Sequence, residues 1–256
     1  MIVAWTQAVA CAAWIGFFAI SGRPFTPPGS AWPAIAASCI LVLGMSGLLA
    51  RASARGDISI VGPILALSPI FTLLPDAVLT GARPSGLGWL GLGLSLAGSV
   101  SLSRGESTRG RVRALLARRD ALDALGAAFL LGFLAAVDRW GALRLGPPSY
   151  LVSSHGGTAM LATLVALLTT PQGLTDSLAP RNLLTLLAHG TLGVSGTGMQ
   201  TTALTMAPAA YVNAIRRMSA VLAVLLGRTL FGEPDLARRL TAALLAGLGA
   251  ACLLLA

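Results

Sequence analysis

The sequence predicts an all-α protein that crosses a membrane many times. Of its 256 residues, 55% are hydrophobic and only 11% are charged, whereas a soluble domain carries about 25% charged residues. Apolar runs of roughly 18–24 residues recur along the chain, and each is long enough to cross a hydrocarbon core of about 30 Å. None of these runs alternates apolar and polar residues as the strand of a membrane barrel does. A polytopic helical membrane protein therefore accounts best for the composition.

Nine apolar runs are expected to form helices, and connectors rich in Gly and Pro separate most of them. The first run lacks the charged start and the small-residue exit of a cleaved signal peptide, so it is interpreted as a spanning helix. Pro63 and Pro69 fall inside the third run, where they are expected to bend the helix. The expected helices are 3–21, 33–50, 59–80, 86–103, 121–143, 148–170, 182–205, 208–231 and 236–255.

The connector 104–120 is rich in Arg and divides the chain into four helices before it and five after it. All 18 basic residues are Arg, and cytoplasmic loops of membrane proteins are enriched in basic residues. Connector 104–120 is therefore predicted to be cytoplasmic, with the N-terminus inside and the C-terminus outside; inverted or dual insertion is the alternative. On the side of the membrane that holds this connector, the sequence places the six Arg of the connector together with Arg51, Arg55, Arg181, Arg238 and Arg239. The opposite side has only Arg23, Arg83 and Arg144.

The two halves of the chain overlay at an offset of 151 residues. Residues 60–102 match the second half without gaps, and identities include Ser68 with Ser219, Gly81 with Gly232 and Gly98 with Gly249. An odd number of helices per repeat gives the two copies opposite orientations, which is the topology that supports alternating access around a midplane site. The predicted organisation is a first repeat at 1–103, the connector 104–120 and a second repeat at 121–256.

Two segments carry a resemblance to a known family. Residues 59–98 (SIVGPILALSPIFTLLPDAVLTGARPSGLGWLGLGLSLAG) and 208–249, with the Gly232-Glu233 pair, resemble the EamA-type family of the drug/metabolite transporter superfamily. The resemblance covers most of the chain through diffuse patterns. It implies ten helices in two inverted five-helix repeats, and it implies export or uptake of small metabolites.

The chain departs from the family in two places. Where the family has Gly-Glu after the fourth helix, this sequence has Gly81-Ala82. The first half also holds only four predicted helices, because residues 3–21 align best with the second helix of the family. Either the true start lies further upstream or the protein has nine helices. In the second case, a homodimer or a partner that supplies a helix is expected to close the cavity.

Arg216 and Arg217 lie roughly 13 Å along the helix that begins near Pro208, at about 1.5 Å per residue. This distance places both guanidinium groups close to the middle of the membrane, where a charged side chain costs free energy on insertion. A charged pair at this depth therefore indicates a structural or functional role. One interpretation is a site for a substrate carboxylate, which a fixed guanidinium suits. The alternative is a structural ion pair with Asp76 or Asp138.

Four further residues are candidates for proton coupling: His155, His189, Asp76 and Asp138. Histidine titrates near neutral pH, although a single His in a helix also serves as a hydrogen-bonded packing residue. Asp138 lies near a helix end, where it could instead extend to the interface. The remaining candidates for substrate binding are Trp14, Gln200, Asn213 and Tyr211, the last with a place in an interfacial aromatic belt as the alternative.

Other functional classes find little support. Cys11, Cys39 and Cys252 stand singly, so neither a metal site nor a disulfide framework is predicted, and no cofactor is expected. No catalytic motif is present, so the protein is not expected to be an enzyme; a membrane enzyme ranks third. The Arg residues form no nucleic-acid-binding pattern.

The expectation is a secondary transporter of amino acids, organic acids or drug-like molecules in the plasma or inner membrane. A non-transporting accessory or scaffold subunit is the alternative.

Overall fold

The computed structural model describes residues 2–55, 61, 64–65, 67–101, 119–169, 180–216 and 236–256. Within these ranges the chain forms helices and short connections, and no strand is found. This confirms the all-α prediction. Connector 104–118 and residues 217–235, with Arg217 and Glu233, lie outside the described residues.

The chain divides into two compact units. Unit 1 comprises Met1–Leu43 and Val137–Met206, and unit 2 comprises Gly44–Ala136 and Ala207–Ala256. Each unit thus combines residues from both halves of the chain. Helices α2 (Trp32–Arg55) and α7 (Arg119–Leu145) contribute one end to each unit.

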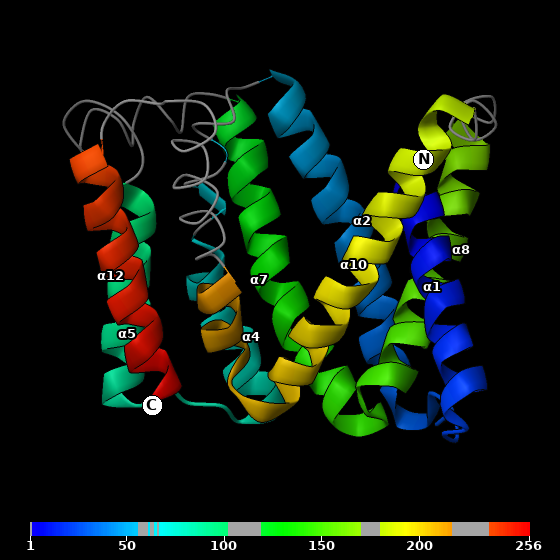
Figure 1. Ribbon diagram of the computed structural model, residues 1–256, viewed down its shortest axis with the longest axis horizontal. Coiled ribbons are helices and arrows are strands. Elements are labelled where there is room, and N and C mark those ends of the chain that lie inside the picture. Colours follow the sequence, from blue (N-terminus) through cyan, green and yellow to red (C-terminus); the bar gives the residue numbers. More distant parts are fainter. Residues whose placement is uncertain are drawn as a thin grey trace. The chain divides into compact units, whose positions relative to one another are not determined.

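Unit 1 is built around three helices, α1 (Ile2–Ser21), α8 (Pro147–Thr169) and α10 (Pro180–Met206), which contact one another (Figure 1). The short 3₁₀ helix η1 (Gly29–Ala31) precedes α2. Helices α1 and α8 are antiparallel, because Cys11 contacts Val152 and Gly156 while Gln7, one turn earlier in α1, reaches His155.

Unit 2 contains α4 (Ser68–Thr80), α5 (Gly86–Ser101) and α12 (Leu236–Leu254), together with a helix at residues 209–216. Helices α5 and α12 lie side by side along their length, although about 140 residues separate them in sequence (Figure 1). The predicted repeat pairs these same two helices at its offset of 151 residues. The division of the chain into repeats remains a prediction.

Four of the described helices are long and apolar enough to cross a membrane. They span Val3–Ser21, Gly29–Ala54, Arg119–Leu145 and Pro147–Thr169. Two shorter apolar helices span Ser68–Thr80 and Gly86–Gly98. The predicted ends of the first, fifth and sixth helices, at 3–21, 121–143 and 148–170, fall within two residues of the observed ends.

Three of these helices end on a glycine in the left-handed conformation, as the Gly-rich connectors predicted. Gly22, Gly81 and Gly146 have φ values of 63°, 72° and 75°. Each donates its N–H to the carbonyl four residues earlier, at 3.1, 3.0 and 2.9 Å. Glycine adopts this conformation without steric cost and satisfies a terminal helix carbonyl.

The prediction about the prolines of the third run was wrong for Pro69. Pro69 lies in the first turn of α4, where the missing N–H would have no partner in any case. The proline inside α4 is Pro75, which removes a hydrogen bond to the carbonyl of Phe71. Pro63 lies outside the described residues.

Glycine allows the backbones of α5 and α12 to come into direct contact. A Cβ atom on Gly249 would lie 2.6 Å from the backbone nitrogen of Ser95 and 2.8 Å from the carbonyl oxygen of Gly91. Backbone atoms cannot move aside as a flexible side chain can. Small residues at such contacts increase van der Waals packing between membrane helices, where burial from water adds little.

We therefore expect Gly249→Ala to destabilise unit 2 by about 1–3 kcal/mol through overpacking. The midpoint of thermal unfolding in detergent should fall by about 2–4 °C for each kcal/mol. Gly247→Ala is the matched control, since a Cβ there meets nothing within 4 Å, and it should leave the midpoint unchanged or raise it. Equal midpoints for both variants would contradict the close contact.

Candidate functional site

A buried histidine joins the three main helices of unit 1. The ring of His155 on α8 pairs through Nδ1 with Oε1 of Gln7 on α1. Its Nε2 lies 3.5 Å from Oγ1 of Thr197 on α10. Because a carbonyl oxygen only accepts, Nδ1 carries the hydrogen in this arrangement, and Nε2 is an acceptor. Gln7, His155 and Thr197 are called the histidine node below.

Trp14 lies beside this node. Its ring packs on Gly198, the residue after Thr197, and a Cβ atom at position 198 would lie 2.8 Å from Cζ2 of the ring. The indole Nε1 is buried and has no hydrogen-bond partner among the described residues. A buried donor without an acceptor costs about 1–3 kcal/mol. Trp14 thus offers an unused donor next to the histidine node.

Asp138 occupies a second polar position in unit 1. Its Oδ1 accepts hydrogen bonds from Ser38 Oγ at 2.9 Å and from Tyr150 Oη at 2.6 Å. Tyr150 is 1% exposed, and its ring packs against Gly141. Asp138 therefore ties α7 to α2 and α8 through its hydrogen bonds, and its expected role in proton coupling stays a prediction.

Arg139, the neighbour of Asp138, donates from Nε to the carbonyl of Leu204 at 3.0 Å. Leu204 lies in the last turn of α10. A cation is favourable at that end of a helix, because the last carbonyls lack partners within the helix. Both charged residues of this pair thus have structural contacts.

Asp76 holds two segments of unit 2 together, α4 and the helix at 209–216. The residue is 1% exposed, and its Oδ1 accepts from Thr80 Oγ1 at 2.8 Å. Its Oδ2 accepts from the backbone N–H of Ala209 at 2.7 Å. Both oxygens therefore act as acceptors, as in an ionised carboxylate, and the negative charge stands at the N-terminus of a helix, where the helix dipole favours it.

Asn213 makes the second contact between these segments. Its Nδ2 donates to Thr72 Oγ1 at 3.1 Å, and the Thr72 hydroxyl donates to the carbonyl of Ser68 at 2.9 Å. Asn213 is 1% exposed. Its Oδ1 and the hydroxyl of Ser68 are buried without a hydrogen-bond partner among the described residues. The row Ser68, Thr72, Asp76 and Thr80 is called the α4 seam below.

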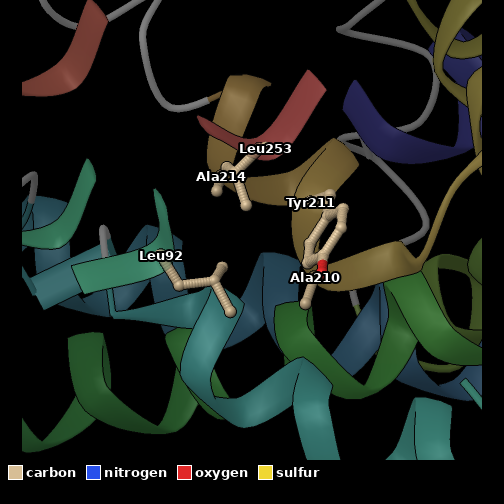
Figure 2. Close-up of a cluster of buried hydrophobic side chains, with 5 residues drawn as sticks. All are labelled: Leu92, Ala210, Tyr211, Ala214 and Leu253. Atoms are coloured by element: carbon tan, nitrogen blue, oxygen red, sulfur yellow. The ribbon is translucent and has the colours of Figure 1, made fainter. Parts of the chain in front are cut away.

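Tyr211 packs inside unit 2. It lies in an apolar cluster with Leu92, Ala210, Ala214 and Leu253 (Figure 2). Its hydroxyl accepts from the backbone N–H of Ser85 at 3.1 Å, and a Cβ atom on Gly88 would collide with that hydroxyl. These contacts give Tyr211 a packing role, and its expected role in substrate binding stays a prediction.

The remaining candidates are only partly placed. Arg216 is exposed at the end of the described helix 209–216, and Gln200 is half-buried on α10. His189 lies on α10, but its side chain is outside the described residues, as is all of Arg217. The structure thus brings Trp14 against Gly198, next to a partner of His155, and it places Asp76 and Asn213 in the contact between the same two segments.

Sequence reasoning missed Gln7 and Thr197 of the histidine node, because the partners of His155 lie 148 and 42 residues away. It also missed the α4 seam. Polar residues at every fourth position from 68 to 80 do mark one helix face, so that signal was readable. No group of three or more His, Cys, Asp or Glu suited to a metal ion occurs among the described residues.

Comparison with known proteins shows the fold of the chain and a family match for its first part. The chain resembles a solved structure, described only as the crystal structure of a protein, with a TM-score of 0.77 and 19% identity; the match covers 99% of this chain and 88% of the other. At 19% identity this similarity shows that the two chains share a fold, and it says nothing about function. No curated protein matches the sequence.

The family comparison is more informative. Residues 1–104 match the model of the EamA-like transporter family, and the predicted first repeat, 1–103, lies within this match. The match agrees with the resemblance seen in residues 59–98. The chain is therefore a multi-pass helical membrane protein whose residues 1–104 match the EamA-like transporter family, which belongs to the drug/metabolite transporter superfamily.

Proposed function

We propose that this protein is a secondary transporter that moves a small metabolite by alternating access, with Trp14 and the histidine node at its substrate site. The family supports a membrane transporter that is not an enzyme. The observation that carries the finer proposal is the unpartnered indole N–H of Trp14, whose ring packs on Gly198 next to Thr197 of the histidine node. Polar and ionisable groups inside a membrane bundle commonly mark the path of a substrate or ion.

The unpaired indole N–H of Trp14 indicates which chemical group the substrate presents to it. An indole N–H can only donate, so the matching ligand group is an acceptor such as a carboxylate or a carbonyl. Amino acids and organic acids carry such a group. Hydrogen bonds to charged acceptors are stronger than neutral ones and are worth about 1.5–3 kcal/mol in a buried site.

His155 is the proposed proton carrier. Its Nδ1 is held by Gln7 and its Nε2 faces Thr197. The hydroxyl of Thr197 lies 2.8 Å from the carbonyl of Gly193 in its own helix. That bond occupies the hydroxyl hydrogen and leaves Nε2 able to accept a proton. Charging this ring next to a bound carboxylate would couple proton binding to substrate binding.

Alternating access requires two bodies that can change position, and an inverted repeat provides them in many transporters. The two compact units and the predicted repeat are consistent with this mechanism. A non-transporting accessory subunit remains the second candidate. Ile15 and Ile20 on the outer face of α1 are 55% and 90% exposed, as expected for apolar side chains that face either lipid or another helix. A second copy of the chain, or a partner that supplies a helix, would cover that face.

The proposal predicts flux in proteoliposomes when a panel of amino and organic acids is offered with and without a pH gradient. Trp14→Phe keeps an aromatic ring but loses the donor, so the apparent affinity should fall about ten-fold, which corresponds to about 1.4 kcal/mol. Trp140→Phe is the matched control, because Trp140 stacks under Arg144 at 4.3 Å. Unchanged affinity in Trp14→Phe would remove Trp14 from the site.

Proton coupling predicts a separate result for His155→Gln. Glutamine retains a hydrogen-bonding side chain but cannot titrate near neutral pH. The variant should still equilibrate the substrate across the membrane, whereas stimulation by a pH gradient should disappear. A gradient that accelerates His155→Gln as much as the unmodified protein would exclude His155 as the proton carrier.

The predicted orientation is testable with single cysteines in a background in which Cys11, Cys39 and Cys252 are replaced by Ala. A cysteine at Ser107 in the connector 104–120 should react with a membrane-impermeant maleimide only after the cells are opened. A cysteine at Ser85, between α4 and α5, should react in intact cells. The reverse pattern would show inverted insertion, and labelling of both sites in intact cells would show dual insertion.

A further inference from the structure

Two exposed arginines lie at one end of unit 1. Arg144 is in the last turn of α7, and Arg23 is in the segment that joins α1 to α2. This joining segment packs on the start of α8, since the N–H of Thr26 donates to Ser149 Oγ at 3.1 Å. It also reaches α7, because Arg144 donates from Nη1 to the carbonyl of Ser30 at 3.3 Å. The end of α1, the end of α7 and the start of α8 therefore lie at the same end of the unit (Figure 1).

The two arginines stand at the level where apolar spans begin and end. Candidate membrane spans end at Ser21 and Leu145, and the next ones begin at Gly29 and Pro147. Spans of this length end near the headgroups of the lipid. Trp32, at the start of α2, is exposed, and Trp is enriched at this level of membrane proteins. We therefore expect both guanidinium groups to lie among lipid headgroups.

An aromatic ring supports each guanidinium group. Cζ of Arg144 lies 4.3 Å from the centroid of the Trp140 ring, and Cζ of Arg23 lies 6.0 Å from that of Phe17. Such a contact occupies one face of the planar group and leaves its N–H groups able to donate at the edge. Arg144 donates one of its five N–H groups to Ser30. Donors of Arg144 therefore remain for a ligand that approaches from outside the protein.

The described part of unit 1 offers these two charges no acidic partner. Its one Asp or Glu is Asp138, which precedes Arg144 by six residues, or about 9 Å along the helix. Neither Arg23 nor Arg144 forms an ion pair with a described residue. This end of the unit thus carries positive charge that an anionic ligand would balance.

We propose that this end of unit 1 binds the headgroup of an anionic phospholipid. Arg144 is the main contact to the phosphate, because the fork of a guanidinium matches two phosphate oxygens, and Arg23 supplies a second positive charge. A lipid fits better than a soluble phosphate ester, since Ile20 and Phe25 beside the arginines are exposed apolar side chains that acyl chains would cover. The inference goes beyond the proposed transport function and does not depend on it.

The lipid preference is measurable without any flux. The purified protein in a neutral detergent is titrated with dioleoyl phosphatidylglycerol or dioleoyl phosphatidylcholine, and the unfolding midpoint reports binding. Attraction of one basic side chain to an anionic membrane surface corresponds to about five-fold in affinity. With two arginines, phosphatidylglycerol should bind about ten-fold more tightly than phosphatidylcholine, or better.

Two outcomes of this titration would overturn the proposal. Equal affinity for the two lipids would show that the headgroup charge is not recognised. An equal shift with glycerophosphoglycerol, which is the headgroup of phosphatidylglycerol without acyl chains, would show a site for a soluble phosphate ester instead of a lipid.

Arg144→Gln and Arg23→Gln test the two arginines. Loss of the contact with Ser30 lowers the midpoint of lipid-free Arg144→Gln, so the readout is the ratio of the two lipid affinities, which should fall about five-fold in each variant. Arg51→Gln is the matched control, because exposed Arg51 already pairs with Asp123 at 3.7 Å, and its ratio should stay the same. An unchanged ratio in both variants, or an equal fall in Arg51→Gln, would overturn the site.

Arg144→Lys separates charge from packing. Lysine keeps the positive charge but lacks the fork of the guanidinium. The variant should therefore retain a preference for phosphatidylglycerol while it binds this lipid more weakly than the unmodified protein does. A preference lost as completely as in Arg144→Gln would contradict a charge-based site.

Discussion

The structure depends on one constraint: hydrocarbon gives a polar side chain no hydrogen-bond partner, so the protein must provide one. In the described residues, the two buried or half-buried carboxylates discussed above each bridge helices far apart in sequence. Asp138 receives bonds from Ser38 and Tyr150, and Asp76 receives the N–H of Ala209. Because burial of apolar surface hardly drives association between helices in lipid, these polar contacts help to decide which helices meet.

The exceptions to this rule carry the functional argument. Trp14 Nε1, Ser68 Oγ and Asn213 Oδ1 are buried without partners among the described residues. A native structure retains such groups where strain, solvent or a ligand accounts for them. Here the ring with the unused donor packs on Gly198, next to Thr197 of the histidine node. The unused acceptors belong to Ser68 of the α4 seam and to Asn213, which donates a hydrogen bond to that seam.

The helices and their ends were predictable because their signals are local. Apolar length defined the runs, and Gly22, Gly81 and Gly146 ended helices where the connectors indicated. The pairings were not predictable, since Ser38 and Asp138 are 100 residues apart and Thr72 and Asn213 are 141 apart. Depth along a helix was readable for Arg216, but not the face on which it lies. The α4 seam was the readable exception, because its four-residue spacing needs no tertiary information.

The central claim is that the transported molecule satisfies the buried indole N–H of Trp14, which has no partner among the described residues. An experimental structure of the protein in lipid, with a transported amino acid bound, tests this most directly. The predicted result is a substrate acceptor within hydrogen-bond distance of Trp14 Nε1, and His155 still in contact with Gln7. A bound substrate with Trp14 Nε1 unpaired, or paired with another protein group, would contradict the claim.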